Sequence, residues 1–466
     1  MTAKYCGNTG CLQKDSTECK GYAGAPSVHH RDSEEQASAH LLEQILERNN
    51  LNRAYLQVKR NHGAAGIDHM SVEESLPWFK EHREEWIESI REGTYNPSPV
   101  RRKDIPKPDG GKRQLGIPTV VDRVLQQAIA QVLSPIYELQ FTATSYGYRP
   151  GKSAHQAIRY IKTCAQAGYT HAVQVDLSKY FDTLNHDLLL NLLRKTIKDK
   201  RVIALIKKYL KAGIMENGVV TKTEQGTPQG GPLSPLLANI YLNEHDQEMK
   251  RRGTISVRYA DDIIILTKSK RAAKHQLESV RKILEGKLKL TMNQEKSKVV
   301  SVYSAKNFKF LGFCLGKNGN GIYIRAHHKS LRKAKAKLKA LTKRNRGRNV
   351  RAIMQEIAQY MRGWLGYYYP ADMKRILQQW SEWLRRRLRQ YIWKQWKKPK
   401  TRVANLKKLG ISAEQAYQWG NTRQGYWRIA GSPVLTRSIT NKALEKAGYY
   451  DILANYERLR EKHVSD

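Results

Sequence analysis

Adjacent carboxylates, Asp261 and Asp262, stand between two apolar runs in "SVRYADDIIILTKS", residues 256–269. β-Branched residues on both sides predict a β-hairpin with the acids at its tip. A third carboxylate, Asp176, ends another predicted strand in "AVQVDLSKYFDTLNH". Acids at strand ends can share two divalent cations, one activating a hydroxyl and one neutralising a leaving pyrophosphate. Oxygen ligands suit Mg²⁺, so the three residues predict two-metal phosphoryl transfer.

The chain as a whole is strongly basic. Its 83 Lys and Arg against 42 Asp and Glu give a net charge of +41 over 466 residues. This excess is unsuited to an ordinary metabolic enzyme and indicates a polyanionic partner, with nucleic acid as the default. An acidic membrane surface is the rival, but no stretch approaches the ~18 consecutive apolar residues of a spanning helix. The start also lacks the apolar core of a secretory signal, so we expect a soluble intracellular protein with no membrane partner.

The five cysteines, at positions 6, 11, 19, 164 and 314, do not make a disulfide framework in so long a chain. Cys6, Cys11 and Cys19 with His29 or His30 could form a zinc site. Their spacings match no familiar ligand pattern, and residues 1–38 are polar without sustained periodicity. A flexible leader is therefore the favoured interpretation.

Length and patterning predict two or three domains. Helical spacing begins near residue 40, at "HLLEQILERNNLNRAYLQVKR". Between about 100 and 315, helical stretches alternate with short β-rich runs, which indicates an α/β or α+β layout. Beyond residue 325 strand signals fade, and residues 325–409 hold 26 Lys and Arg against 3 Asp and Glu.

A charge run of this kind is often only a solvated helix face. In "ILQQWSEWLRRRLRQYIWKQWKK", however, the apolar residues recur at helical spacing, and Arg385, Arg386 and Arg389 fall largely off that stripe. The aromatic residues of the stripe are expected to be core. The three arginines are predicted to bind RNA phosphates.

Taken alone, an Asp-Asp pair is more often a surface turn, but other motifs in a fixed order reverse that interpretation. "DLSKYFD", "GTPQGGPLSPLLANIYL", "YADD" and "FKFLGF" together resemble a reverse transcriptase. "GAAGIDHMSVEE" before them and "YMRGWLGYYYPADMKRILQQW" after them resemble the N-terminal extension and maturase region of group II intron-encoded reverse transcriptase/maturases. The resemblance runs from about residue 40 to the C-terminus.

This resemblance implies an α+β right-hand polymerase, with fingers and palm, followed by an all-α thumb/maturase domain and a short basic C-terminal region. The implied domains are a leader (1–38), an N-terminal extension with the start of the fingers (39–99), fingers and palm (100–318), thumb/maturase (325–400) and a DNA-binding-like region (401–466). No Cys follows Cys314, and only about 60 residues follow "KKPKTRV". This ending resembles bacterial members that lack an endonuclease, so we expect no cleavage of the opposite DNA strand.

The resemblance also assigns roles to matching residues. Two Mg²⁺ ions, with Mn²⁺ as a substitute, are expected on Asp176, Asp261, Asp262 and the carbonyl of Leu177. Nucleotide contacts are expected from Lys107 and Arg113 of "IPKPDGGKRQLGIP", Tyr180 and Phe181 of "DLSKYFD", Gln229 of "GTPQGG" and Lys296 of "LTMNQEKSK". Phe310, Leu311 and Gly312 of "FKFLGF" are expected to grip the primer end. The ring of Tyr180 is expected under the sugar, where it would exclude a ribose 2′-hydroxyl.

The function implied is RNA-directed DNA synthesis together with binding of an intron RNA, which assists splicing and mobility. Expected partners are the intron RNA, an RNA template with a DNA primer, target DNA and dNTPs, in the bacterial cytoplasm or nucleoid. Two alternatives stay open: a splicing-only maturase, and a domesticated reverse transcriptase of phage defence or diversity generation. An RNA-dependent RNA polymerase would usually have Gly-Asp-Asp where this chain has Ala-Asp-Asp.

Overall fold

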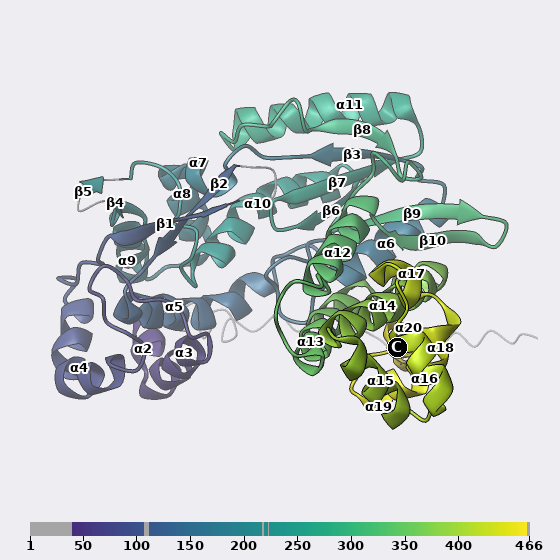
Figure 1. Cartoon of the computed structure of the whole chain (residues 1–466). Helices are drawn as coiled ribbons and strands as arrows, with labels where there is room; N and C mark the ends of the chain where they lie inside the picture. The colour runs from purple at the N-terminus through teal and green to yellow at the C-terminus, as the bar shows by residue number, and fades with distance from the viewer. Residues whose placement is uncertain (1–39, 107–110, 217–218, 222, 464–466) are drawn as a thin grey trace, which may run out of the picture.

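The computed structural model describes residues 40–106, 111–216, 219–221 and 223–463 (Figure 1). The predictions for Cys6, Cys11, Cys19 and Lys107 lie outside these ranges.

The chain begins, within the described part, with helices α2 (Leu41–Leu46), α3 (Arg48–Arg60) and α4 (Ser75–Arg91). They gather near α5 (Val120–Glu138) at one end of the molecule (Figure 1). Thr119 caps the N-terminus of α5, and its hydroxyl accepts a hydrogen bond from the Asp122 amide. The Asn50 side chain donates to the Ala128 carbonyl over 3.1 Å, which ties α3 to α5.

The first sheet has the order β2-β1-β4-β5. Strands β1 (Val100–Pro106) and β2 (Lys112–Ile117) are antiparallel, and β1 runs parallel to β4 (Ile214–Glu216), which pairs with β5 (Val219–Thr221). The two strands expected in "IPKPDGGKRQLGIP" are therefore present, and residues 107–110 between them lie outside the described residues.

The second sheet is antiparallel throughout, in the order β6-β7-β3-β8. Its strands are β3 (His171–Val175), β6 (Ile255–Tyr259), β7 (Asp262–Thr267) and β8 (Lys298–Ser301). In β7, Ile263 and Ile265 belong to one hydrophobic core while Ile264 and Leu266 belong to another. Because both faces of the sheet are covered, the strand is apolar without alternation.

Helices surround this sheet. Helix α11 (Lys270–Arg281) packs on β3, β7 and β8, while α10 (Ser234–Arg251) and α6 (Ala154–Gln166) pack on β6 (Figure 1). The remaining helices of this region are α7 (Tyr180–Thr183), α8 (His186–Thr196), α9 (Lys200–Lys211) and the π-helix η1 (Lys282–Lys287).

A hairpin, β9 (Phe313–Asn318) and β10 (Gly321–Ala326), leads into the helical C-terminal part. Its helices are α12 (His328–Leu341), α13 (Val350–Tyr368), α14 (Lys374–Gln395), α15 (Pro399–Lys408), α16 (Ala413–Gly420), α17 (Tyr426–Ala430), α18 (Pro433–Ser438), α19 (Asn441–Lys446) and α20 (Ile452–Lys462). The predicted fold class is confirmed: an α+β fingers and palm followed by helices. The five domain boundaries stay predictions.

Candidate active site

The hairpin predicted around the paired acids is confirmed. Strands β6 and β7 pair Tyr259 with Asp262, which leaves Ala260 and Asp261 as a two-residue turn. Ala260 has a φ of 57°, a left-handed conformation that glycine usually occupies in such turns. A strained non-glycine residue persists only where its surroundings fix it.

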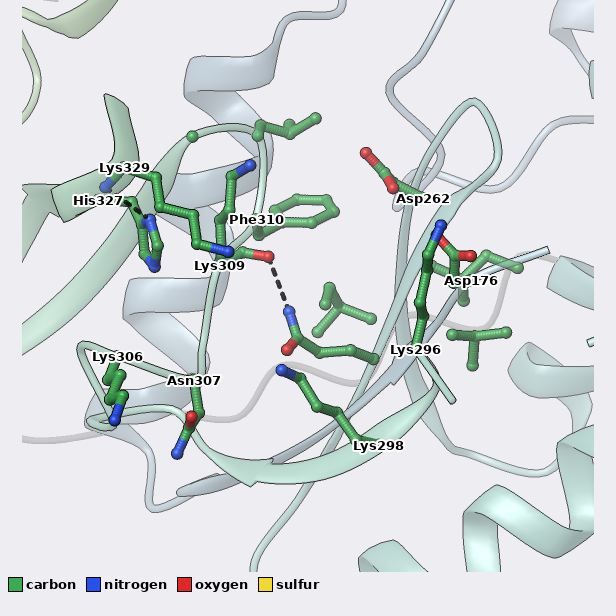
Figure 2. Close-up of a pocket in the computed structure, with 16 residues that line it drawn as sticks. Asp176, Asp262, Lys296, Lys298, Lys306, Asn307, Lys309, Phe310, His327 and Lys329 are labelled. Atoms are coloured by element: carbon green, nitrogen blue, oxygen red, sulfur yellow. Dashed lines mark hydrogen bonds between the residues drawn. The ribbon is translucent and has the colours of Figure 1, made fainter. Parts of the chain in front are cut away.

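Asp176 follows β3 directly and lies beside this turn. Val175 pairs with Ile263, so the next residues along the two antiparallel strands, Asp176 and Asp262, are neighbours at the same sheet edge. Figure 2 shows both carboxylates on one wall of a cavity. The Asp176 amide donates to the Ser297 hydroxyl (3.0 Å), and the Asp176 carbonyl accepts from the Asn293 amide (2.8 Å).

Leu177, predicted to offer its carbonyl to a metal, forms an isolated antiparallel bridge with Met292. Its side chain is buried, and the Ser178 amide donates to the Thr291 carbonyl over 2.9 Å. The backbone after β3 is therefore fixed on one side by residues 291–297. Lys296, a predicted nucleotide contact, belongs to this same segment.

The protonation of Asp262 reflects its neighbours. Asp262 is exposed to solvent on one side. The protein around its carboxyl group still removes part of the hydration shell, and the charges of Asp261 and Asp176 add repulsion. Together these effects raise the pKa of Asp262 to about 6. Lys309 acts in the opposite direction and lowers the pKa. The three acids thus repel one another electrostatically.

These residues fit divalent cations by charge and by donor type. Carboxylate oxygens are hard ligands of the kind Mg²⁺ prefers, and a cation would relieve the repulsion that raises the pKa of Asp262. The side chains are not gathered into a closed site: within the described ranges, no three Asp, Glu, His or Cys side chains lie close enough to hold an ion. The predicted metal ligands Asp176 and Asp262 are therefore neighbours at one sheet edge without a closed site around them.

The cavity at this edge has a volume of about 310 Å³ and is strongly basic (Figure 2). Sequence reasoning identified Lys296 and the segment Phe310, Leu311 and Gly312, all of which line it. It missed four further lysines of the lining: Lys298, Lys306, Lys309 and Lys329. For two of them, Lys306 and Lys309, the available signal was their place in and next to "FKFLGF", in "SAKNFKFLGF".

The segment predicted to grip the primer is held by helix α13. Leu311 and Gly312 both have positive φ, 52° and 82°. The Tyr367 hydroxyl donates to the Leu311 carbonyl over 2.8 Å. A Cβ on Gly312 would lie 2.4 Å from the Tyr368 hydroxyl oxygen, so only glycine fits there.

The Tyr180 prediction is wrong. Its side chain is 3% exposed, and its hydroxyl donates to the Ala238 carbonyl over 2.7 Å. Burial raises its pKa well above the usual value. A ring with this environment belongs to the core and cannot lie under a sugar.

Phe181, the other predicted nucleotide contact of "DLSKYFD", faces a cavity instead of the core. It lines a second cavity, of about 260 Å³, between the first sheet and the "GTPQGG" loop, together with Gln114 of β2 and Gln229. The Gly116 amide donates to the Gln229 carbonyl over 2.9 Å. A Cβ on Gly230, whose φ is 144°, would meet the Gly116 carbonyl at 2.4 Å. The glycine therefore lets loop and sheet approach closely.

Arg113 lies on β2 opposite Ile105, with its side chain exposed. Its charge influences Tyr148, a half-exposed tyrosine whose pKa is raised by desolvation first and then by Asp261. Arg113 lowers the pKa of this tyrosine while the hairpin acids raise it, so all of them lie within electrostatic reach of one side chain.

Two of the three arginines predicted to bind RNA make contacts within the protein, and the burial of one of them, Arg389, shows that its prediction is wrong. Arg389 is buried and donates to the Ile439 carbonyl (2.8 Å) and the Asn441 side chain (2.9 Å). Arg386 lies 4.1 Å above the Trp427 ring and donates to the Trp427 carbonyl. Both contacts hold later helices on α14. The Arg389 guanidinium is enclosed in the protein, whereas Arg386 stays partly exposed. Arg385 is half-buried.

No helix in the described part of the chain is long and apolar enough to cross a membrane.

Comparisons with known proteins agree with this geometry. Residues 105–315 match the family of reverse transcriptases (RNA-dependent DNA polymerases), and residues 331–410 match the group II intron maturase-specific domain. Protein YkfC of Escherichia coli K12 is 36% identical over 266 residues, which cover 48% of this chain and 68% of YkfC. The group II intron-encoded protein LtrA of Lactococcus lactis subsp. cremoris is 33% identical over 328 residues, covering 56% of this chain and 54% of LtrA.

Among solved structures, a partial Cas6-RT-Cas1–Cas2 complex matches with 26% identity and a TM-score of 0.34, over 53% of this chain and 43% of that one. Candida albicans telomerase matches with 13% identity and a TM-score of 0.39, over 74% of this chain and 69% of that one. The two family matches, in this order along the chain, and the relatives YkfC and LtrA lead to one conclusion. The chain belongs to the group II intron-encoded reverse transcriptase/maturase family.

Proposed function

We propose that this protein copies RNA into DNA in the bacterial cytoplasm, with a primer end beside the Asp176, Asp261 and Asp262 edge and a dNTP reaching it from the fingers. The observation that carries the proposal is the cavity that two of these carboxylates line together with five lysines and the predicted primer grip. The three carboxylates and the Leu177 carbonyl would hold Mg²⁺, which when bound would activate the primer hydroxyl and neutralise charge on the leaving pyrophosphate.

The chain's own residues carry the remaining tasks. Lys296, Lys298 and Lys309 attract the phosphates of primer and nucleotide into the cavity. The turn at Leu311 and Gly312 supports the primer end. On the other side, Phe181 and Gln229 contact the nucleotide sugar, and Arg113 reaches the triphosphate from β2.

The test is extension of a DNA primer on an RNA template by purified protein. Asp261→Ala should lower the rate by about 100-fold or more, the scale of losing a main electrostatic contact to the transition state. Glu278→Ala, an exposed acid of α11 paired with Arg281, is the matched control and should extend normally. Near-normal extension by Asp261→Ala refutes the proposal, provided both variants bind the duplex equally.

A second function is favoured by the maturase match at residues 331–410. We propose that the basic face of α12, which includes the exposed Lys333 and Lys337, binds an intron RNA and assists its splicing. Asp261→Ala should then support splicing as well as the wild type does, because that step needs RNA binding and not DNA synthesis. Loss of splicing in this variant, with RNA affinity intact, would contradict the separation of the two functions.

A further inference from the structure

A fully buried arginine lies directly beneath the Ala260–Asp261 turn. Arg258 of β6 has 0% exposure, and its guanidinium forms an ion pair with the buried Asp246 of α10, 2.6 Å from Nη2 to Oδ2. Its Nε also donates to Asp246 over 2.8 Å. Neither charge has access to solvent, so each depends on the other for compensation.

The same guanidinium reaches the turn itself. Its Nη1 donates to the Asn239 side-chain oxygen over 2.7 Å and to the Ala260 carbonyl over 3.1 Å. Asn239, also buried, belongs to α10. The carbonyl of the one left-handed residue in the turn is therefore linked through Arg258 to a long helix.

A second backbone segment holds the turn from the side. The Arg258 amide donates to the Thr144 carbonyl (3.0 Å), and the Arg258 carbonyl accepts from the Tyr146 amide (2.8 Å). Asn239 donates to the Gly147 carbonyl over 2.8 Å. A Cβ on Gly147 would lie 2.2 Å from the Ala260 nitrogen, so backbone touches backbone here.

From these contacts we propose that Arg258, with Asp246 and Asn239, is a positioning residue that fixes the strained turn so that Asp261 and Asp262 point into the active site. Asp261 and Asp262 directly follow the carbonyl that Arg258 holds. Without this donor, Ala260 has less to keep it at positive φ, and relaxation of the turn would rotate both acids. The inference rests on the proposed polymerase function for its catalytic readout.

A purely stabilising role fits the observations less well. A buried ion pair is often no more stable than well-packed apolar residues of similar volume. Breaking it by a single substitution leaves a buried charge, so Arg258→Met alone would confuse stability with positioning. The double variant Arg258→Met/Asp246→Asn removes both charges together and nearly keeps the volume, while it deletes the donor to the Ala260 carbonyl.

The experiment compares the wild type, this double variant, Arg258→Lys and the control Arg251→Met, an exposed arginine of α10 paired with Glu248. Melting temperature, duplex affinity, kcat and KM for dNTP, and the Mg²⁺ concentration for half-maximal rate are measured for each. We expect the double variant to fold and bind duplex, with kcat lower by about 100-fold, KM nearly unchanged and a higher Mg²⁺ requirement. Arg258→Lys, whose amine can reach only part of the network, should be intermediate.

The affinity of the protein–duplex complex for Mn²⁺, measured by calorimetric titration, is a readout that does not need catalysis. The double variant should bind Mn²⁺ more weakly than Arg251→Met does. A folded double variant with wild-type kcat and wild-type Mn²⁺ affinity overturns the proposal. If the wild type itself fails to extend primers, the proposed polymerase function fails, and the Mn²⁺ titration alone decides the role of Arg258. A double variant that does not fold shifts the decision to Arg258→Lys, where unchanged kcat and Mn²⁺ affinity overturn it.

Discussion

The Tyr367 hydroxyl of α13 donates a 2.8 Å hydrogen bond to the Leu311 carbonyl, which joins the maturase-like helices to the turn beside the active site. The link is reinforced by rings: Phe313 lies 5.4 Å from Tyr367 and 5.1 Å from Tyr368 between ring centroids. His155 of α6 contacts the Tyr367 carbonyl over 2.7 Å. Helix α13 therefore contacts the predicted primer grip directly.

Tyr367→Phe should weaken use of the primer end while leaving RNA affinity intact. The substitution removes one hydrogen bond, with a net value of about 1 kcal/mol, and leaves the ring contacts in place. We expect KM for the primer-template to rise about fivefold. Steady-state extension at varied duplex concentration measures it, with the exposed Tyr417→Phe as the control. An unchanged KM would show that the bond does not support the primer.

Sugar selection should depend on Phe181 and not on Tyr180. Phe181→Ala removes the ring that lines the nucleotide-side cavity, so ribonucleotide incorporation should rise in single-nucleotide assays. Tyr180→Phe should leave the dNTP preference unchanged and lower stability by about 1 kcal/mol, because its bond to the Ala238 carbonyl is removed. An unchanged preference for dNTPs in Phe181→Ala would contradict the assignment of sugar selection to Phe181.

The raised pKa of Asp262 has a sign that stability measurements can check. Its folded-state pKa of about 6 lies above the ordinary 3.8, so the folded protein loses stability as pH rises through that window. Asp262→Asn should therefore raise the melting temperature of the metal-free protein above pH 6 and have little effect near pH 4. Mg²⁺ should stabilise the wild type more at pH 7.5 than at pH 5. Equal Mg²⁺ effects at both pH values would contradict this coupling.

RNA affinity should come from α12 more than from α14. Lys333 and Lys337 are exposed on α12, whereas Arg389 is buried against Ile439. Changing both lysines to Gln should lower the salt slope of RNA binding by about 0.7 to 0.9 for each phosphate that the protein no longer neutralises. Arg389→Gln should instead lower the melting temperature. A slope unaffected by the lysine changes would show that this face of α12 is only solvated.

Much of the site follows from sequence because its signals are local. A β-branched run interrupted by two acids predicts the hairpin, and the strand before Asp176 has the same character. The pairing of β3 with β7, which makes Asp176 and Asp262 neighbours, is a long-range fact that these local signals do not contain.

Two predictions failed where a single residue's direction matters. Lys179 has a φ of 47°, and this left-handed residue turns the chain so that Tyr180 enters the core and Phe181 faces the cavity. For Arg389, helical spacing indicates which residues lie off the apolar stripe, but not that a later segment packs on that face. Arg258 was missed because a charge within a strand gives no sign of the buried partner it will meet.

The central place of β3 in its sheet also has a kinetic consequence. Its partners β7 and β8 arrive only after α7, α8, α9 and α10 have been added to the chain. Pairings between segments so distant in sequence form late, because a long loop must close before they contribute. A growing polypeptide holds Asp176 long before Asp261 and Asp262 exist. During refolding, helical ellipticity should therefore return before the capacity to join nucleotides.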